Sequence, residues 1–321
     1  MPEKEKQKLK GMNTVSEEST QKTAFISIVG RPNVGKSSIL NAMLGSKVAI
    51  VSHKPQTTRT RIMGILTKEE TQLVFIDTPG LLKPHNRLGE YMVKSVLESV
   101  SGVDACLLVE EAGKKISNSS LELIEKFKQL GLPAVLAINK IDLLPDKSVL
   151  MTQITEFTKL FNFEAVVPVS AVNNSGIGSL TDELERLAQP GGHFFDDDAL
   201  TDQPERVLAS EIIREKLLRL LSSEVPHGVA VSVEKMTERD DKSNITDILA
   251  TIYCEKESHK GIIIGKNGAM LKKVGTYARE DMEKFFGCKI NLKVWVKVKE
   301  DWRNREAALR AFGYDSSNFD G

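Results

Sequence analysis

The stretch Gly30-Arg31-Pro32-Asn33-Val34-Gly35-Lys36-Ser37 decides the fold of the first part of the chain, because it joins an apolar run to a helical pattern. It matches the GxxxxGK(S/T) motif, in which glycines allow a tight loop whose backbone N–H groups surround phosphates. The loop ends at a helix N-terminus, where the helix dipole favours anions. We expect Lys36 to reach the β- and γ-phosphates and Ser37 to bind Mg²⁺. The predicted phosphate site also includes Ser38, which follows the motif.

Around this loop, short apolar runs alternate with helical patterns over residues 23–188. Runs of this kind suit strands that are buried on both faces of a parallel sheet. We predict strands at 25–29, 73–76, 105–109, 134–138 and 165–169, and helices at 37–44, 88–101, 121–130, 149–161 and 179–188. The alternation predicts a doubly wound α/β domain with a mostly parallel sheet over residues 23–189.

Three further segments follow predicted strands and point to guanine nucleotides. Asp77-Thr78-Pro79-Gly80 places a carboxylate near the phosphate loop as an indirect Mg²⁺ partner, and its last amide is placed to sense a γ-phosphate. Asn139-Lys140-Ile141-Asp142 ends in a carboxylate that can accept the N1 and N2 protons of guanine, a pattern that adenine does not offer. Ser170-Ala171-Val172 can present a backbone amide to the guanine O6. Each segment alone is weak, but the ordered set predicts a guanine-nucleotide switch.

This set of motifs resembles that of the Era family of GTPases. The segment Lys54-Pro55-Gln56-Thr57-Thr58-Arg59 is similar to the first switch loop of that family, where a threonine closes on Mg²⁺ and the γ-phosphate. By position we expect Thr58 to bind Mg²⁺, with Thr57 as the alternative. The resemblance implies an enzyme that hydrolyses GTP to GDP and phosphate.

Two residues bear on the rate of hydrolysis. Leu81 directly follows the last glycine of the Asp77-Thr78-Pro79-Gly80 segment, where Ras has the glutamine that orients the attacking water. Leucine cannot hydrogen-bond a water molecule, so intrinsic hydrolysis should be slow. In related GTPases, an asparagine at the position of Asn33 helps to hold a K⁺ ion that takes the place of an arginine finger. The resemblance therefore implies K⁺ as a second cofactor.

A smaller α+β domain is predicted at residues 205–305, after an exposed linker at 190–204 that opens with Pro190-Gly191-Gly192. We predict helices at 205–221 and 269–286, and strands at 229–234, 245–253 and 290–298. Before the second helix, the step Gly265-Lys266-Asn267-Gly268 combines glycines that let the backbone approach a sugar–phosphate chain with a helix N-terminus. This GxxG step resembles the signature loop of a type II KH domain, which binds RNA.

Basic residues are concentrated around the GxxG step. Residues 260–299 contain ten basic and three acidic side chains, an excess of +7 in a chain whose 44 basic and 44 acidic residues cancel. Such a local excess is typical of a nucleic-acid surface. Phe285, Phe286 and Trp295 fall at positions typical of a core, so we do not expect them to stack on bases. The predicted RNA-binding residues are Ile264, Gly265, Lys266, Asn267, Gly268, Lys272, Lys273, Lys293 and Lys297.

The order of the two domains is also that of the Era family, and the resemblance covers residues 23–305. It implies binding to the 3′ end of small-subunit (16S) ribosomal RNA, a role in assembly of the small ribosomal subunit, and loose attachment to the inner membrane. Cys106, Cys254 and Cys288 form no disulfide or zinc pattern, and no apolar run approaches the ~20 residues that span a bilayer. We expect a monomer in the cytoplasm, with residues 1–22 and 306–321 as tails.

Two alternative functions keep the same first domain. In one, a membrane-associated signalling or transport GTPase docks a protein through its second domain, which the GxxG step disfavours. In the other, a tRNA-modification or ribosome-binding GTPase binds a different RNA. A KH loop indicates RNA binding without specifying the RNA.

Overall fold

The computed structural model describes residues 21–314 except 53, 55, 82, 83, 147 and 241–243. Its first domain contains a seven-stranded sheet in which the order β2-β3-β1-β4-β5-β6 is extended by β7, which pairs with β1. The β2–β3 and β1–β7 pairs are antiparallel and the other pairs are parallel. The strands are β1 Lys22–Val29, β2 Ile62–Lys68, β3 Thr71–Asp77, β4 Ala105–Glu111, β5 Ala134–Asn139, β6 Ala165–Pro168 and β7 Gln189–Pro190.

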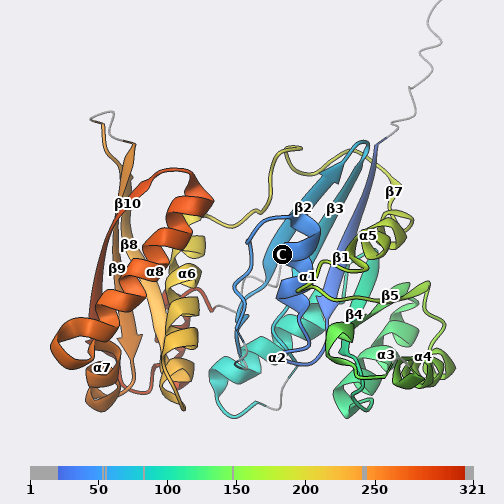
Figure 1. The fold of residues 1–321 in the computed structure, drawn as a ribbon, viewed down its shortest axis with the longest axis horizontal. Helices are drawn as coiled ribbons and strands as arrows, with labels where there is room; N and C mark the ends of the chain where they lie inside the picture. Colours follow the sequence, from blue (N-terminus) through green and yellow to red (C-terminus); the bar gives the residue numbers. More distant parts are fainter. Residues whose placement is uncertain are drawn as a thin grey trace, which may run out of the picture.

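Helices cover both faces of this sheet (Figure 1). One apolar core lies between the sheet and the helices α1 and α5, and a second lies between the sheet and α2, α3 and α4. The helices are α1 Lys36–Leu44, α2 Arg87–Ser99, α3 Asn118–Leu130, α4 Ser148–Leu160 and α5 Ile177–Glu185, with a short 3₁₀ turn at Ile141–Leu143. The predicted doubly wound α/β fold is confirmed. The sequence analysis missed β2, a half-buried strand at the edge of the sheet.

The second domain packs two long helices on one face of a three-stranded sheet of order β10-β9-β8. Strands β9 and β10 are parallel, and β8 is antiparallel to β9. The elements are α6 Glu205–Leu220, β8 Ala230–Glu238, β9 Ile245–Cys254, α7 Glu257–Ile264, α8 Ala269–Phe286, β10 Lys289–Val298 and α9 Glu306–Ala311, with 3₁₀ turns at Val225–Gly228, Lys266–Gly268 and Trp302–Asn304. In Figure 1, α6 and α8 lie between this sheet and the first domain.

Two expectations about the second domain are corrected. The sequence analysis assigned no helix before the GxxG step, but α7 ends there, because the run Ile262-Ile263-Ile264 hides the helical period. Trp295 was expected in a core, and this was wrong: its side chain is 60% exposed. Phe286 does pack in the core of the second domain, whereas Phe285 packs against the core of the first.

Two segments that lie outside the predicted domain boundaries, the linker and α9, pack against the folded domains. The linker runs along the edge of the first sheet, where Phe195 and Leu200 accept hydrogen bonds from Gln72 and Ile65 at 2.9 and 3.0 Å. Helix α9, in a region we expected to be a tail, joins an aromatic cluster with Trp302 and α2. Residues 1–20 and 315–321 of the expected tails lie outside the described part, as does Pro55 of the first switch loop.

None of the helices in the described part of the chain is long and apolar enough to cross a membrane. Cys106, Cys254 and Cys288 are free thiols.

Candidate nucleotide and nucleic-acid sites

The loop between β1 and α1 takes the shape that a phosphate site requires. Gly30 and Gly35 have φ angles of 145° and 102°, and a Cβ on Gly35 would lie 2.1 Å from the side-chain nitrogen of Asn139. Only glycine fits at such a position. The buried Lys36 ammonium group donates hydrogen bonds to the carbonyl oxygens of Gly30 and Arg31 at 3.2 and 3.1 Å.

The Lys36 ammonium group is held in the protein interior. Burial lowers the pKa of Lys36 to about 8, although the carboxylates of Asp77 and Glu110 act in the opposite direction. A phosphate beside the ammonium group would favour its charged form. The loop therefore combines a buried cation with the N–H groups at the start of α1.

Three oxygen-bearing side chains from separate segments meet next to this loop. The Ser37 hydroxyl donates to the Asp77 carboxylate at 2.6 Å, and the Thr58 hydroxyl lies 3.0 Å from that of Ser37 and donates to Asp77 at 3.4 Å. The other carboxylate oxygen of Asp77 is buried without a hydrogen-bond partner. Hard oxygen donors with one oxygen unsatisfied fit Mg²⁺. Thr57 instead donates to the carbonyl oxygen of Lys54 at 2.6 Å, so Thr58 is the threonine that faces this group.

The segment after β3 packs against the phosphate loop. Thr78 donates to the backbone of β1 at 2.8 Å, and Pro79 is buried. A Cβ on Gly80 would lie 2.6 Å from the Cα of Pro32, so only glycine allows this approach. Leu81 is buried in the core beside α2 and α3. A side chain in that position offers no group that could orient water.

At the other end of the site, residues after β5 and β6 form a hydrogen-bonded frame. Asn139 donates to the carbonyl oxygen of Val34 at 2.9 Å and accepts from the backbone N–H of Ala171 at 3.1 Å. Its amide therefore joins the phosphate loop to the segment after β6. The Asp142 carboxylate accepts from the Ser170 hydroxyl at 2.5 Å, which fixes one of its oxygens.

The sequence analysis missed two acidic residues at the end of β4. Glu111 pairs with Lys140 at 2.7 Å, and the buried Glu110 pairs with Arg31 at 3.3 Å. Each ion pair fixes the charged group of a predicted site residue, Lys140 in the first pair and Arg31 in the second. The signal was present in the sequence, because two acids end the otherwise apolar strand Ala105–Glu111.

These segments line one cleft of about 500 Å³. It has the phosphate loop at one end and the Asp142 carboxylate at the other, as a nucleotide that runs from phosphates to base requires. The predicted site residues that line it are Pro32, Asn33, Gly35, Lys36, Ser37, Ser38, Thr57, Thr58, Gly80, Asn139, Lys140, Asp142 and Ala171.

The second domain holds the loop that carries Thr58. Arg214 of α6, whose side chain is 1% exposed, donates to the carbonyl oxygens of Gln56 at 3.4 Å and of Thr57. Glu211, one turn earlier on α6, accepts from the Arg214 guanidinium group at 2.7 Å and fixes it. Helix α6 therefore holds the two backbone positions that precede Thr58.

We call the hydrogen bonds of Arg214 to the Gln56 and Thr57 carbonyls the clamp. Further contacts between the two domains surround it. Arg59 is buried and donates to the carbonyl oxygens of Val229 and His227 at 2.6 and 2.9 Å. Lys47 pairs with Glu215 of α6 at 2.5 Å and with Asp281 of α8 at 2.7 Å. The contacts involve both long helices of the second domain.

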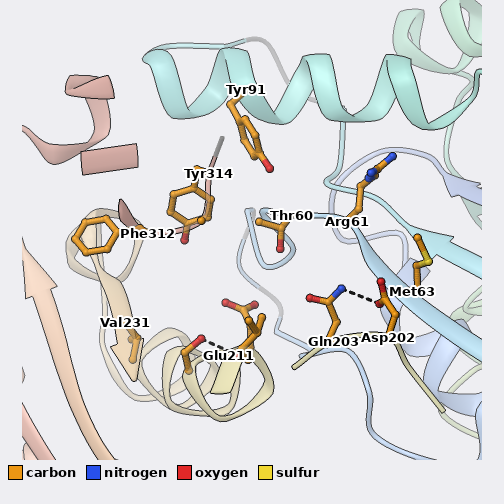
Figure 2. Close-up of a pocket in the computed structure, with 13 residues that line it drawn as sticks. Thr60, Arg61, Met63, Tyr91, Asp202, Gln203, Glu211, Val231, Phe312 and Tyr314 are labelled. Atoms are coloured by element: carbon orange, nitrogen blue, oxygen red, sulfur yellow. Dashed lines mark hydrogen bonds between the residues drawn. The ribbon is translucent and has the colours of Figure 1, made fainter. Parts of the chain in front are cut away.

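Beside these contacts, the domains enclose a small cleft of about 260 Å³ (Figure 2). Thr60 and Arg61 of the first domain, Glu211 of α6 and the rings of Tyr91 and Tyr314 line it. Tyr91 lies on α2, the helix that follows the Asp77-Thr78-Pro79-Gly80 segment. The segment that follows Thr58 and helix α2 therefore both lie against the second domain.

The GxxG step between α7 and α8 exposes its central side chains. Gly265 and Gly268 have φ angles of 72° and 76°, and a Cβ on Gly265 would lie 2.8 Å from that of Met270. Lys266 and Asn267 are exposed. The step thus presents a cation and an amide at the N-terminus of α8, a long helix.

The structure divides the predicted RNA-binding residues into two groups. Lys272 and Lys273 lie exposed on the first turns of α8, next to the GxxG step and the half-buried Ile264. Lys293 and Lys297 project from the other face of the sheet, because the alternate residues of β10 pack against the helices. The two groups therefore do not form one surface.

The fold and these residues define a P-loop GTPase followed by a KH domain. A family model described as "50S ribosome-binding GTPase" matches residues 25–140, and one described as "KH domain" matches residues 224–303. The chain is 49% identical over 294 residues to GTPase Era of Clostridioides difficile, covering 92% of this chain and 99% of that one. It is 48% identical over 296 residues to GTPase Era of Ruminiclostridium cellulolyticum, covering 92% and 98%.

Two solved structures are similar over the same extent. A single-residue variant of Aquifex aeolicus Era bound to GDP·AlF4⁻ has a TM-score of 0.88 at 37% identity, and covers 92% of this chain and 99% of its own. Era in complex with MgGDPNP and nucleotides 1506–1542 of 16S ribosomal RNA has a TM-score of 0.87 at 37% identity, with the same coverage. The chain belongs to the Era family, and it is a GTPase.

Proposed function

We propose that this GTPase binds the single-stranded 3′ end of small-subunit ribosomal RNA through its KH domain and assists assembly of the small ribosomal subunit. The observation that carries this is the GxxG step, which presents Lys266 and Asn267 at the start of α8. Backbone without side chains at Gly265 and Gly268 allows a sugar–phosphate chain to approach closely. The relative crystallised with 16S ribosomal RNA supports the choice of RNA.

The nucleotide site acts through groups that are already in place. Lys36 and the N–H groups of the phosphate loop bind the phosphates, and Asp142 accepts the guanine protons. Ser37 and Thr58 would hold Mg²⁺ directly, with Asp77 behind them. When bound, Mg²⁺ neutralises charge that develops on the phosphates during transfer to water. Residues 23–189 form the unit that hydrolyses GTP, and residues 205–305 form the unit that binds RNA.

Hydrolysis by this site is slow and is stimulated by K⁺. Leu81 cannot orient water, and Asn33, the residue proposed to help hold K⁺, lines the cleft. Turnover and GTP-analogue affinity would be compared in KCl and NaCl at equal ionic strength, for the wild type and for Asn33→Ala. We expect faster turnover in KCl only in the wild type. Equal rates in both salts would contradict a role for K⁺ and leave the assignment of the nucleotide site intact.

The RNA proposal is tested by placing negative charge on the GxxG step. Lys266→Asp with Asn267→Asp changes the charge by −3 where a phosphate chain approaches most closely. We expect binding to an oligoribonucleotide of the small-subunit RNA 3′ end to be lost, while GTP affinity is retained. Lys114→Asp with Lys115→Asn makes the same charge change on an exposed loop of the first domain and serves as the control.

The folding of both variants is checked by circular dichroism. A folded GxxG variant that binds this RNA as tightly as the wild type would rule out a working KH site. If the control also lost binding, overall charge and not the GxxG step would be responsible.

The proposal places the protein in the cytoplasm as a monomer with loose attachment to the inner membrane, as the family resemblance implies. Flotation with vesicles that contain anionic lipids tests the membrane attachment, and the mass measured by light scattering tests the monomeric state.

A further inference from the structure

Strand β10 exposes a tryptophan on the open face of the KH sheet. Its even-numbered residues from Ile290 to Val298 pack against the helices, whereas Lys293, Trp295 and Lys297 point to the opposite face. The Trp295 side chain is 60% exposed and belongs to none of the core clusters in the described residues. An exposed tryptophan of this size needs an explanation, because burial of an aromatic ring is favourable.

The neighbours of Trp295 give this face a positive charge. By strand register, Trp295 lies beside Thr251 of β9 and Lys293 lies beside Leu249. Five basic and two acidic side chains share the face, a net charge of +3. The basic residues are Lys235, Arg239, Lys289, Lys293 and Lys297, and the acidic residues are Glu234 and Asp247.

The two acids are already paired, so the positive charge is available to a ligand. Asp247 binds Arg239 at 2.8 Å and accepts from Asn291 at 2.5 Å. Glu234 accepts from the Thr251 hydroxyl at 2.6 Å, and Lys297 approaches it only to 3.9 Å. Within the described residues, the ammonium group of Lys293 makes neither a hydrogen bond nor an ion pair, although its charge helps to lower the pKa of Asp247.

The spacing of these groups suits a single nucleic-acid strand. Lys293 and Lys297 lie two positions before and after Trp295, so their Cα atoms are about 6.6 Å along the strand on either side of it. Bases stack on exposed aromatic rings, and neighbouring cations bind the phosphates.

Other ligands fit this face less well. A bilayer surface requires a broad apolar face, but the apolar side chains that share this face with Trp295 are the half-buried Ile245, Leu249 and Tyr253, and Tyr253 packs against Phe312. The core of a protein interface is depleted in lysine, which is abundant here. The charge and the exposed aromatic ring together favour nucleic acid.

We propose that Lys293, Trp295 and Lys297 form a second single-stranded RNA surface. One unpaired base stacks on Trp295, and the two lysines bind the adjoining phosphates. The surface is separate from the GxxG step, because α7 and α8 pack on the other face of the sheet. This second proposal depends on the proposed function in one respect, because it takes RNA as the ligand.

The direct test uses the fluorescence of Trp295 in the full chain. The chain has two tryptophans, and Trp302 is fully buried with its indole N–H bonded to the carbonyl oxygen of Gly228 at 2.9 Å. The probes are oligoribonucleotides of the small-subunit RNA 3′ end with increasing length. We expect the longer probes to quench emission in the wild type and to leave Trp295→Phe unquenched. Unchanged emission in the wild type with RNA bound would overturn the proposal.

Affinity measurements separate stacking from charge. Trp295→Ala and Trp295→Leu should each weaken binding of the long RNA about tenfold, with an unchanged salt dependence, because a base contact is lost but no phosphate contact. Trp295→Phe keeps a ring and should retain most of the affinity. If Trp295→Leu bound the long RNA as tightly as Trp295→Phe, an aromatic ring would not be needed. The base would then not stack on Trp295, and the proposal would fail.

Three results distinguish this proposal from the proposed function. Loss of binding in the Lys266→Asp, Asn267→Asp variant with normal binding in Trp295→Ala contradicts only the second surface. A wild type that binds no RNA contradicts both. Quenching or a blue shift with anionic phospholipid vesicles in place of RNA would overturn the proposal and assign the surface to a membrane.

Discussion

The phosphate loop and the GxxG step are both glycine-containing loops at the N-terminus of a helix, but they differ in burial. Lys36 lies in the interior and is fixed by two backbone carbonyls, whereas Lys266 lies in solvent at the start of α8. The first loop belongs to a cleft that encloses one small molecule. The second exposes Lys266 and Asn267 to solvent, where a polymer can approach.

This difference predicts how the two sites respond to mutation. In an enclosed site, a mismatched polar group stays buried and unpaired, so one residue can determine the ligand. On an open surface, many weak ionic contacts share the binding energy, and each change has a small effect that depends on salt.

The largest effect is expected at Asp142. An amide in place of the carboxylate donates a hydrogen bond where guanine needs an acceptor, so Asp142→Asn should lose GTP affinity by a factor on the order of 10⁴ and gain xanthosine triphosphate. Competition binding with both nucleotides measures this. The control is Asp146→Asn, an exposed position four residues later. Retained GTP affinity in Asp142→Asn would show that the base lies elsewhere.

A smaller effect is expected from the clamp on the loop before Thr58. Arg214→Met removes the donors to the Gln56 and Thr57 carbonyls, so a GTP analogue should need about tenfold more Mg²⁺ to bind, and turnover should fall. GDP binding should change little. Arg219→Met is the control, because Arg219 on the same helix is half exposed, pairs with Glu215 and donates to the carbonyl oxygen of Val51, well before Thr58.

The Mg²⁺ titration distinguishes positioning from simple destabilisation. Arg214→Lys should recover part of the Mg²⁺ response, since it restores one donor. If Arg214→Met weakened GDP and the GTP analogue equally, the clamp would have a structural role only.

The smallest effects are expected at single lysines of the KH domain. Lys293→Ala or Lys297→Ala should each lower the slope of log affinity against log salt by roughly 0.7, because one phosphate contact to a single strand is lost. Lys159→Ala, an exposed lysine on α4, should leave the slope unchanged. A slope unaffected by both Lys293→Ala and Lys297→Ala would remove the open face of the sheet from the RNA site.

The sequence predicted the parts of the molecule that depend on local pattern. The phosphate loop, the strand that leads into it and the group formed by Ser37, Thr58 and Asp77 follow from motif and strand order. Helix α7 was missed because its three isoleucines obscure the helical period. Strand β2 was missed because an edge strand, half exposed, lacks the continuous apolar run of a buried one.

Features that depend on tertiary packing could not be predicted. Trp295 belongs to a strand in which polar and apolar residues alternate. The sequence does not show which face of this strand the helices cover, so it could not predict that Trp295 is exposed. Arg214 gave no signal on α6, because its partners are backbone carbonyls from a loop 157 and 158 positions away. Helix α9 is short, and it is held by Trp302 and α2 and not by its own sequence pattern.

Because α6 contacts the loop before Thr58, we expect nucleotide state and RNA binding to be coupled. Thr58 lies 3.0 Å from Ser37, and Arg214 holds the carbonyl oxygen of Thr57 next to it, so we expect a γ-phosphate that binds Thr58 to act on the same loop that α6 contacts. The same arrangement leaves Lys266 and Asn267 exposed to RNA. Coupling energies between sites commonly change affinity by about 5- to 150-fold, and the effect is reciprocal.

The most direct test is the affinity of the full chain for the small-subunit RNA 3′ end, measured at one salt concentration with GDP and with a non-hydrolysable GTP analogue. We expect tighter binding with the analogue, by at least about fivefold, and a smaller difference in Arg214→Met. Equal RNA affinity in the two nucleotide states of the wild type would contradict a switch loop shared by the two domains.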